Sequence, residues 1–423
     1  MKIIVLGAGI TGIATAWYLC RAGHEVTVVE RREGPGLETS YANGGQISVS
    51  HAEPWANPHA PLQVLRWLGR EDAPLLFRLR ADWQQWRWGL AFLRECPPSR
   101  LRQNIRQIVA LGNYSRALLQ QLRADTGIHY DHLTRGILHF YTSHAAWRAA
   151  QHAAQLMREA GCALKTKTAD ECAILEPALA PLRGRIVGGT YAPADESGDA
   201  HRFTCALAEL CATRGVTFRH DAAVQALQPA SADRVGSISI RRADGATETL
   251  AADRYVVCLG AYSPLLLRPL GIDLRIYPVK GYSVTLPVRD PARAFTVSLT
   301  DDEHKLVFSR LGERLRIAGT AEFAGYDTTL NQARCAAILH RFNTLFPGAG
   351  AVNHAQFWTG LRPATPSNVP YIGSTRYNNL FLNTGHGTLG WTQACGAGAA
   401  IADWISGRRP EVNFAFSGSL PSG

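Results

Sequence analysis

The sequence has no uninterrupted apolar run of about eighteen residues, so it predicts no helix that crosses a membrane. It has no Cys-x-x-Cys pair, and its nine cysteines lack metal-ligand spacing, so we predict no metal site. A secretory or lipoprotein signal is also missing, because Tyr18 and Leu19 precede Cys20 where cleavage would need small residues. Without such a signal, an odd number of cysteines indicates reduced thiols, and we expect a cytoplasmic protein.

The chain also lacks a Lys-rich tail, an internal repeat of fixed period and a separate RNA-binding module, so we expect no nucleic-acid partner. Its net charge is +10 and its pI is about 9.3, which favours an anionic partner such as an acidic lipid surface or an anionic substrate. Hydrophobic residues make up 46% and charged residues 18%, as in a globular protein. With 423 residues, the chain is long enough for two or three domains.

The N-terminal segment carries the clearest motif. Residues 2–7 and 25–30 are short apolar runs rich in β-branched residues, which predict two buried strands, and residues 13–21 predict a helix between them. The turn after the first strand carries glycines in G-x-G-x-x-G spacing, namely Gly7, Gly9 and Gly12. The complete βαβ unit predicts a dinucleotide-binding site.

Each part of this unit has a predicted role. Gly7 makes the tight turn, Gly9 lets the backbone approach a pyrophosphate, and Gly12 lets the helix pack closely on the strand. The helix N-terminus offers free N–H groups and a partial positive charge to the phosphates. Glu30 ends the second strand, where a carboxylate accepts a ribose 2′-OH.

Two later stretches, 254–263 and 379–390, repeat the pattern of a strand followed by a glycine turn. Three such turns converge on one cofactor only if that cofactor is long. The last turn opens a helix, and a helix N-terminus stabilises the negative charge of a reduced flavin. We therefore predict FAD rather than a nicotinamide dinucleotide. The polar segment 31–45 is interpreted either as a loop along this cofactor or as an ordinary connection.

The predicted fold is α/β (α+β), with a Rossmann-like FAD-binding domain that is discontinuous in sequence and an inserted substrate domain built on an antiparallel sheet. An amphipathic helix at 99–126 and a strand-rich block from 276 onward interrupt the dinucleotide-binding strands, which indicates an insertion. We predict FAD-binding parts at 1–85, 161–275 and 351–416, substrate-domain parts at 86–160 and 276–350, and a disordered tail at 417–423.

Residues 46–96 combine tryptophan with arginine. Two interpretations stay open for this stretch. It is either a surface that docks on an anionic membrane, where amphipathic rings and cationic heads meet lipid headgroups, or a set of core tryptophans with solvated arginines opposite. The residues are Trp55, Trp67, Trp83, Trp86, Trp88, Arg66, Arg70, Arg78, Arg80, Arg87 and Arg94.

Short motifs spread over essentially the whole chain lie at 7–12, 38–40, 43–48, 54–56, 277–283, 358–363 and 383–392. They resemble the motifs of the bacterial D-amino acid dehydrogenase small-subunit family, within the wider group of FAD-dependent D-amino acid oxidases and glycine oxidases. Trp-Thr-Gly-Leu-Arg-Pro at 358–363 and the glycine turn at 383–392 are the most specific of them. One residue departs from the family, because His51 stands where a tyrosine is expected.

The resemblance implies a site residue by residue. Arg362 would clamp a substrate carboxylate, because a guanidinium binds a carboxylate through two parallel bonds. The alternative is a structural arginine that caps a loop. Tyr282 is a weaker candidate for a substrate contact, and His386 would either touch the flavin or pack in the glycine turn. The implied cofactor-binding residues are Gly7, Gly9, Ile10, Thr11, Gly12, Glu30, Arg31, Arg32, Glu38, Ser40, Asn43, Gly44, Gly45, Gln46, Ile47, Val224, Gly260, Gly385, His386, Gly387, Thr388, Leu389 and Gly390.

The resemblance also implies an activity, the oxidation of a D-amino acid such as D-alanine to a 2-oxo acid and ammonia, with hydride transfer from Cα to flavin N5. Electrons would pass to a quinone or another respiratory-chain acceptor, and peripheral binding to the inner face of the cytoplasmic membrane would bring the enzyme close to it. Two other activities stay open. One is an oxidase that passes electrons to O₂, and the other is a flavoprotein that modifies a tRNA base.

Overall fold

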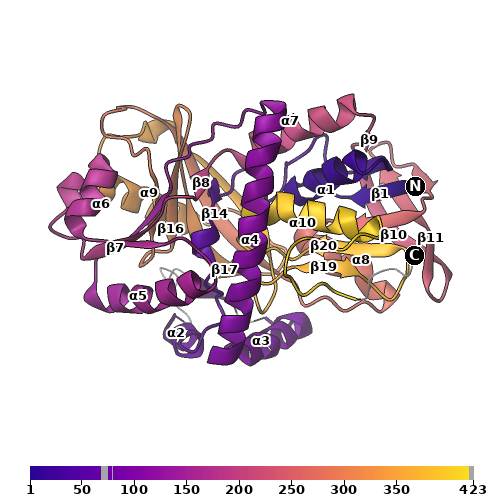
Figure 1. Ribbon diagram of the computed structural model, residues 1–423, viewed down its shortest axis with the longest axis horizontal. Helices are drawn as coiled ribbons and strands as arrows, with labels where there is room; N and C mark the ends of the chain where they lie inside the picture. Colours follow the sequence, from indigo (N-terminus) through magenta and orange to yellow (C-terminus); the bar gives the residue numbers. More distant parts are fainter. Residues whose placement is uncertain (68–74, 79, 419–423) are drawn as a thin grey trace.

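The computed structural model describes residues 1–67, 75–78 and 80–418. Two large sheets form the body of the molecule, and in Figure 1 the long helix α4 (Pro98–Thr126) crosses in front of the boundary between them. One sheet is mainly parallel and the other mainly antiparallel. The architecture is therefore the α/β arrangement, with a second, antiparallel sheet, that the sequence predicts.

The mainly parallel sheet has the strand order β19-β20-β13-β1-β2-β9. The strands from β20 to β9 run parallel, and β19 is antiparallel at the edge. Apart from the exposed Lys2, the first strand is buried, as its β-branched run predicts. The strands are β1 (Lys2–Leu6), β2 (Glu25–Val29), β9 (Thr217–Arg219), β13 (Arg254–Val257), β19 (Tyr371–Ser374) and β20 (Leu380–Thr384).

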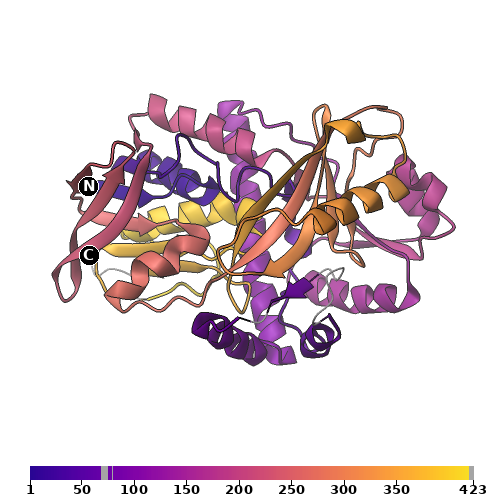
Figure 2. The same cartoon turned by 180° about the vertical axis from the view of Figure 1, so that it is seen from behind.

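One face of this sheet is covered by α1 (Ile10–Arg21), α7 (Ala200–Thr213) and α10 (Gly390–Ile405), which share its larger core. The opposite face packs against α8 (Ser263–Leu267) and a small sheet (Figure 2) of β10 (Ala222–Ser231), β11 (Arg234–Arg242) and β12 (Thr247–Leu250). Strands that are buried on both faces need apolar residues on both sides, which explains their unbroken apolar runs.

The mainly antiparallel sheet has the strand order β18-β14-β17-β16-β15-β5-β7-β6, with β4 paired to β17. Its core is shared with α9 (Gln332–Leu345) and α6 (Ala169–Leu175). The strands are β4 (Leu75–Phe77), β5 (Ile137–Tyr141), β6 (Lys165–Lys167), β7 (Gly188–Ala192), β14 (Tyr277–Pro287), β15 (Ser298–Asp301), β16 (Leu306–Leu311), β17 (Arg314–Phe323) and β18 (Gln356–Ala364).

The remaining elements connect the two sheets. A short ladder of β3 (Gln46–Ile47) and β8 (Glu196–Ser197) leads into the 3₁₀ helix η1 (Val49–His51). Helices α2 (Ala60–Trp67), α3 (Trp83–Glu95) and α5 (His144–Glu159) lie around one end of α4 at the bottom of Figure 1.

The strand pairing corrects the predicted assignment of four strands. The sequence pattern assigns β4, β6, β7 and β18 to FAD-binding parts, because they lie within 1–85, 161–275 and 351–416. In the structure all four hydrogen-bond into the antiparallel sheet. A hydrophobic pattern identifies a strand but not its partner, because the partner lies far away in the sequence.

The predicted disordered tail is also partly wrong. Ser417 pairs with Gly373 at the edge of the parallel sheet, where its N–H donates to the carbonyl of Ile372 at 2.7 Å. The backbone groups of an edge strand are free to bind such a segment, whatever its side chains are. Residues 419–423 of the predicted tail lie outside the described residues.

Candidate functional site

A cavity of about 2060 Å³ lies between the two sheets. Its walls come from the carboxyl ends of β1, β2 and β13, from the face of β14, β17 and β18, and from the turn before α10. Ligands of α/β proteins bind at the carboxyl ends of the parallel strands. Ordinary small-molecule pockets measure about 300–1,000 Å³, so this cavity has room for a long cofactor together with a substrate.

The glycine fingerprint forms one end of the cavity. Gly7 has a φ of +101°, and its N–H donates to the carbonyl of Val29 at 2.8 Å. A Cβ on Gly12 would lie 1.9 Å from the carbonyl oxygen of Gly7, so this position requires glycine for helix–strand packing. A Cβ on Gly9 would meet only the Ser40 hydroxyl, at 3.7 Å. The protein therefore leaves the space beside Gly9 open to a ligand.

The buried carboxylate of Glu30 lies beside this turn. It accepts hydrogen bonds from the backbone N–H groups of Ala8 at 2.7 Å and Arg32 at 3.0 Å. These bonds orient the carboxylate and leave lone pairs free for a ligand hydroxyl. The neighbouring Glu38 carboxylate is paired with Arg31 at 2.6 Å and with Arg32 at 2.7 Å.

The segment 39–48 ties the two sheets together along the cavity. At one end, the Ile10 N–H donates to the Ser40 hydroxyl at 3.0 Å, which attaches the segment to the N-terminus of α1. Further along, the Ser309 hydroxyl donates to the carbonyl of Gly44 at 2.8 Å, which attaches it to β16. The segment is therefore more than an ordinary connection, because its residues form part of the cavity wall.

The last glycine turn completes the cavity before α10. Gly385 and Gly387 have positive φ values of +84° and +54°, and His386 is held between them. The Nε2 atom of His386 is buried and has no hydrogen-bond partner in the described part of the chain. Burial lowers the pKa of His386 to about 3, so the ring is neutral at physiological pH. A neutral ring with an unused nitrogen, next to a helix N-terminus, fits the polar edge of a flavin.

Most of the residues predicted to bind the cofactor line this cavity. Four do not. Gly12 packs beneath the turn, Arg32 pairs with Glu38, Ile47 lies in the core, and Gly385 shapes the last turn. The predicted residues that line the cavity are Gly7, Gly9, Ile10, Thr11, Glu30, Arg31, Glu38, Ser40, Asn43, Gly44, Gly45, Gln46, Val224, Gly260, His386, Gly387, Thr388, Leu389 and Gly390.

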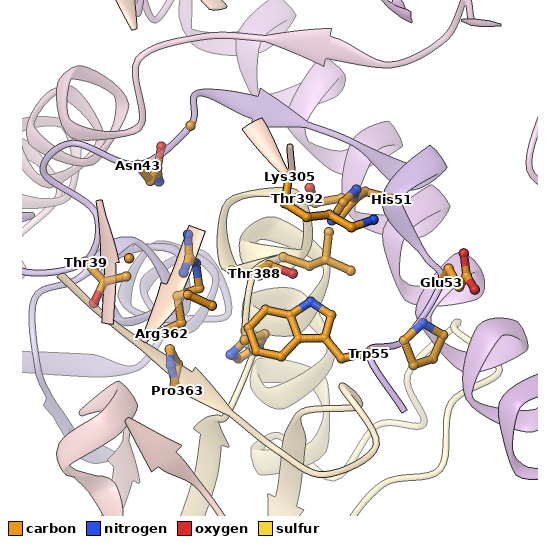
Figure 3. A pocket seen from close by; sticks show the side chains of 18 of the residues that line it. Thr39, Asn43, His51, Glu53, Trp55, Lys305, Arg362, Pro363, Thr388 and Thr392 are labelled. Carbon is orange, nitrogen blue, oxygen red and sulfur yellow. The ribbon is translucent and has the colours of Figure 1, made fainter. Parts of the chain in front are cut away.

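Arg362 reaches the cavity from β18 (Figure 3). Its guanidinium lies over Gly281, where a Cβ would approach Cζ to 2.5 Å, and Nη1 donates to the carbonyl of Thr320 at 2.8 Å. Burial and then the charge of Arg334 lower the pKa of Arg362 to about 10, so the group stays cationic at neutral pH. Within residues 1–67, 75–78 and 80–418, no carboxylate forms an ion pair with it.

Tyr282 lines the cavity from the neighbouring strand β14, but its hydroxyl donates to the carboxylate of Glu322. Glu322 is also paired with Arg78 at 2.7 Å and with Lys280 at 3.4 Å. The predicted contact of this hydroxyl with a substrate would have to compete with an ionised partner. We therefore interpret Tyr282 as part of an ionic network behind the cavity wall.

A polar cluster that the sequence did not reveal also lines the cavity. It consists of Ser50, His139, Tyr141, Asp302 and Lys305. The one local signal is that His139 interrupts the otherwise apolar and aromatic strand β5. The members come from η1, β5 and the turn after β15, so only the tertiary structure brings them together.

His51, the residue that departs from the family, stacks on His139 with ring centroids 6.1 Å apart. Burial and then the nearby His139 lower the pKa of His51 to about 4. A histidine of the unfolded chain has a pKa of about 6.5 and therefore binds a proton that the folded protein excludes. Stability consequently falls as the pH drops from about 7 towards 4.

We expect His51→Tyr to remove about 2 kcal/mol of this acid destabilisation between about pH 7 and pH 5. Denaturant unfolding of the FAD-loaded protein at the two pH values measures the change. His129→Tyr, at an exposed histidine, is the matched control and should keep the wild-type pH dependence. An equal loss of stability between the two pH values in wild type and in His51→Tyr would show that His51 is not the source of the acid destabilisation.

The family described as FAD dependent oxidoreductase matches residues 2–404. A D-amino acid dehydrogenase of Dechloromonas aromatica is 58% identical over 98% of this chain and 99% of its own length. One of Paramagnetospirillum magneticum is 55% identical over 98% and 97%. Among solved structures, glycine oxidase from Geobacillus kaustophilus is similar over 100% of both chains, with a TM-score of 0.74 and 22% identity. L-proline dehydrogenase from P. horikoshii covers 97% of this chain and 95% of its own, with a TM-score of 0.74 and 17% identity.

The sequence matches confirm the family that the motifs predict and FAD as its cofactor, and the structural matches confirm the fold. The glycine-lined cavity, the oriented Glu30 carboxylate and the unused nitrogen of His386 fit that cofactor. The chain therefore belongs to the FAD dependent oxidoreductase family and, within it, to the D-amino acid dehydrogenases.

Proposed function

We propose that this enzyme oxidises D-amino acids such as D-alanine to imino acids, which water converts to 2-oxo acids and ammonia. When bound, FAD would take two electrons from the substrate as a hydride. We propose further that the electrons leave for a quinone or another respiratory acceptor. The activity named for the relatives supports the substrate class.

The observation that carries the proposal is the state of Arg362. It is a partly buried cation whose plane is held by a backbone carbonyl and whose charge has no anionic partner in the described residues. A buried charge without a partner is costly, so the site favours an anionic ligand. A substrate carboxylate that accepts two parallel N–H bonds would supply that anion and restrict how Cα is presented.

The decisive experiment is a panel of D- and L-amino acids with an artificial dye acceptor in the absence of air. We expect reduction of the dye with D-amino acids and none with their L-enantiomers. Turnover of L-amino acids only, or of neither enantiomer, would exclude the proposed substrate class. A ligand without a carboxylate, such as a simple amine, is the control and should not be oxidised.

An oxidase that uses O₂ is the second candidate, because glycine oxidases share the fold. The arrangement of elements does not distinguish the two acceptors. Measuring hydrogen peroxide in air with D-alanine separates them. We expect much less than one peroxide per oxidised substrate when a quinone is present, and one peroxide per substrate would identify an oxidase.

The surface of α2 and α3 supports a lipid-soluble acceptor. Leu62 and Trp83 are 62% and 67% exposed, and the exposed Trp86 and Leu90 also line the cavity. Apolar side chains thus lie both on the surface and along the cavity. No helix in the described parts of the chain is long and apolar enough to cross a membrane. We propose that this surface rests on the inner face of the cytoplasmic membrane, where a quinone is dissolved.

Some tryptophans and arginines of the stretch 46–96 fit the membrane-docking interpretation, and others fit the interpretation as core residues. Trp88 is a core residue that stacks on Phe92 at 5.2 Å, whereas Trp83 and Trp86 face solvent. Arg78 pairs with Glu322. The side chain of Trp67 and the whole of Arg70 lie outside the described residues. The exposed aromatic and aliphatic residues are therefore sharper probes of membrane binding than the arginines.

We expect Leu62→Gln combined with Trp83→Gln to weaken binding to anionic vesicles by about 10-fold or more, because each change removes apolar surface from the contact. Neither residue lines the cavity, so dye-linked activity should stay unchanged. Vesicle co-sedimentation measures the binding. Ile174→Gln, which alters a residue that is 78% exposed on α6, is the matched control. Wild-type vesicle binding by the double variant would show that this surface is not the membrane contact.

A further inference from the structure

A chain of three polar groups lies in the cavity wall. The His139 ring makes a 2.8 Å contact from Nδ1 to the carboxylate of Asp302 and a 3.3 Å contact from Nε2 to the hydroxyl of Ser50. Because an ionised carboxylate only accepts hydrogen bonds, Nδ1 must carry the proton. Nε2 is then an acceptor that faces the Ser50 hydroxyl. Hydroxyl, imidazole and carboxylate in this order are the arrangement by which enzymes move a proton off a hydroxyl.

Each member of this chain is held in place by other groups. Asp302 also accepts a hydrogen bond from the Tyr141 hydroxyl at 2.9 Å and pairs with Lys305 at 3.4 Å. The backbone N–H of Ser50 donates to the buried Asp195 carboxylate at 2.9 Å. Although burial opposes its ionisation, Lys305 and then His139 hold the pKa of the Asp302 carboxyl well below its usual range. The carboxylate is therefore ionised at neutral pH and keeps the imidazole in one tautomer.

The cluster and Arg362 lie on different sides of the cavity. In Figure 3, Arg362 projects on one side and Lys305 and His51 on the other, with Thr388 between them. An amino acid has its two charged groups on one carbon, so a carboxylate anchored at Arg362 leaves the ammonium group free to point across the cavity. The cations Lys305 and Arg362 disfavour a further positive charge there, which favours loss of a proton from the ammonium group.

Hydride leaves an amino acid only from the form with a neutral amine, because the nitrogen lone pair must form the C=N bond. We infer that the chain of Ser50, His139 and Asp302 takes that proton from the bound substrate. In this step an N–H bond of the ammonium group breaks, and its electron pair stays on nitrogen. The proton passes to Ser50 Oγ as the hydroxyl proton of Ser50 passes to His139 Nε2. No electrons are transferred, and the imidazolium is stabilised by Asp302. The inference rests on the proposed function.

Among the titratable groups in this part of the cavity, His139 is the one suited to accept the proton from Ser50. The pKa of His51 is lowered to about 4 by burial and by His139, so His51 is too weak a base at neutral pH. Glu53 is not joined to the serine by any hydrogen bond in the described residues, and Lys305 is a cation paired with Asp302. The titratable and charged groups that surround His139 are His51 of η1, Glu53 after it, Tyr141 of β5, and Asp302, Glu303 and Lys305 of the turn.

The test is the pH dependence of flavin reduction by D-alanine, followed anaerobically by stopped flow. We expect His139→Gln to slow the reduction about 100-fold at about pH 7, the usual size of an acid–base contribution. At about pH 10 a substantial part of the free amino acid arrives as the neutral amine, so the deficit should shrink to a few-fold. Imidazole added to His139→Ala should restore part of the rate at neutral pH.

His304→Gln is the matched control. His304 contacts Asp301 at 3.1 Å in the same turn, but neither residue lines the cavity, so the control should behave as wild type. Binding of propionate, a carboxylate without an amine, should perturb the flavin spectrum equally in wild type and His139→Gln. That second measurement reports the intact cofactor and carboxylate sites independently of turnover.

Two outcomes overturn the inference. The first is a His139→Gln deficit that does not change with pH, as a purely structural role predicts, and the second is a pH profile identical to wild type. If His139→Gln fails to fold or to bind FAD, Ser50→Ala decides, since it keeps the pair of His139 and Asp302. A wild-type pH profile in Ser50→Ala then excludes the relay. If no D-amino acid reduces the flavin of the wild type, the proposed function fails instead.

Discussion

Arg362→Ala is expected to lower kcat/KM for D-amino acids by about two to four decades while FAD stays bound. Removing one partner of a buried ion pair costs about 3–5 kcal/mol, because the other charge is left without compensation. In this variant the uncompensated charge would be the substrate carboxylate. Arg362→Lys should recover only part of the loss, because an ammonium group lacks the planar fork that binds both carboxylate oxygens.

Arg314→Ala is the matched control for this prediction. Arg314 lies on β17 of the same sheet, but its guanidinium already pairs with Asp199 at 2.7 Å and with Asp131 at 3.0 Å. Its removal should lower the melting temperature with a small effect on KM. Steady-state kinetics with the dye acceptor and the flavin absorbance of each variant provide the comparison. Near-normal kinetics in Arg362→Ala would remove Arg362 from the substrate site.

Alanine substitutions at two glycines of the G-x-G-x-x-G motif, Gly9 and Gly12, are expected to impair the protein for different reasons. Gly9 has φ −68° and ψ 173°, which alanine adopts easily, and a Cβ there would make only one ordinary contact. Gly9→Ala should therefore fold but bind FAD at least about 100-fold more weakly, because the methyl group occupies the space a pyrophosphate needs. Gly12→Ala should destabilise the protein itself, since its Cβ would lie 1.9 Å from the carbonyl oxygen of Gly7.

Thermal unfolding of the FAD-free proteins separates the two effects. Gly9→Ala should melt at the wild-type temperature when FAD is removed and should gain little when FAD is added back. Gly12→Ala should melt lower with and without FAD. A Gly9→Ala protein that retains stoichiometric FAD through gel filtration would show that the cofactor does not approach the backbone at this position.

The pairing of the strands explains why the domain boundaries predicted from the sequence were partly wrong. Residues 165–167 and 188–192 lie within 161–275, which the sequence pattern assigns to the FAD-binding domain. In the structure, 188–192 pair with β5 and 165–167 pair with 188–192, so both join the other sheet. The run at 356–364 carries Arg362 and joins β14, which brings that cation to the cavity. Every strand offers the same backbone donors and acceptors, so the choice of partner depends on which faces pack together.

The sequence by itself determined the βαβ unit at 2–29, the glycine spacing, the FAD cofactor and the family. The βαβ unit and the glycine spacing follow from adjacent residues, because backbone turns, helix starts and strand burial are encoded within a few positions of the chain. FAD and the family follow from several such local motifs taken together. Only the tertiary structure decided that Trp88 is buried while Trp83 and Trp86 are exposed, since a helix pattern shows two faces but not which one meets a neighbour. It alone also brought Ser50, His139 and Asp302 together, because hydrogen bonds between residues 89 and 163 positions apart leave no local signature.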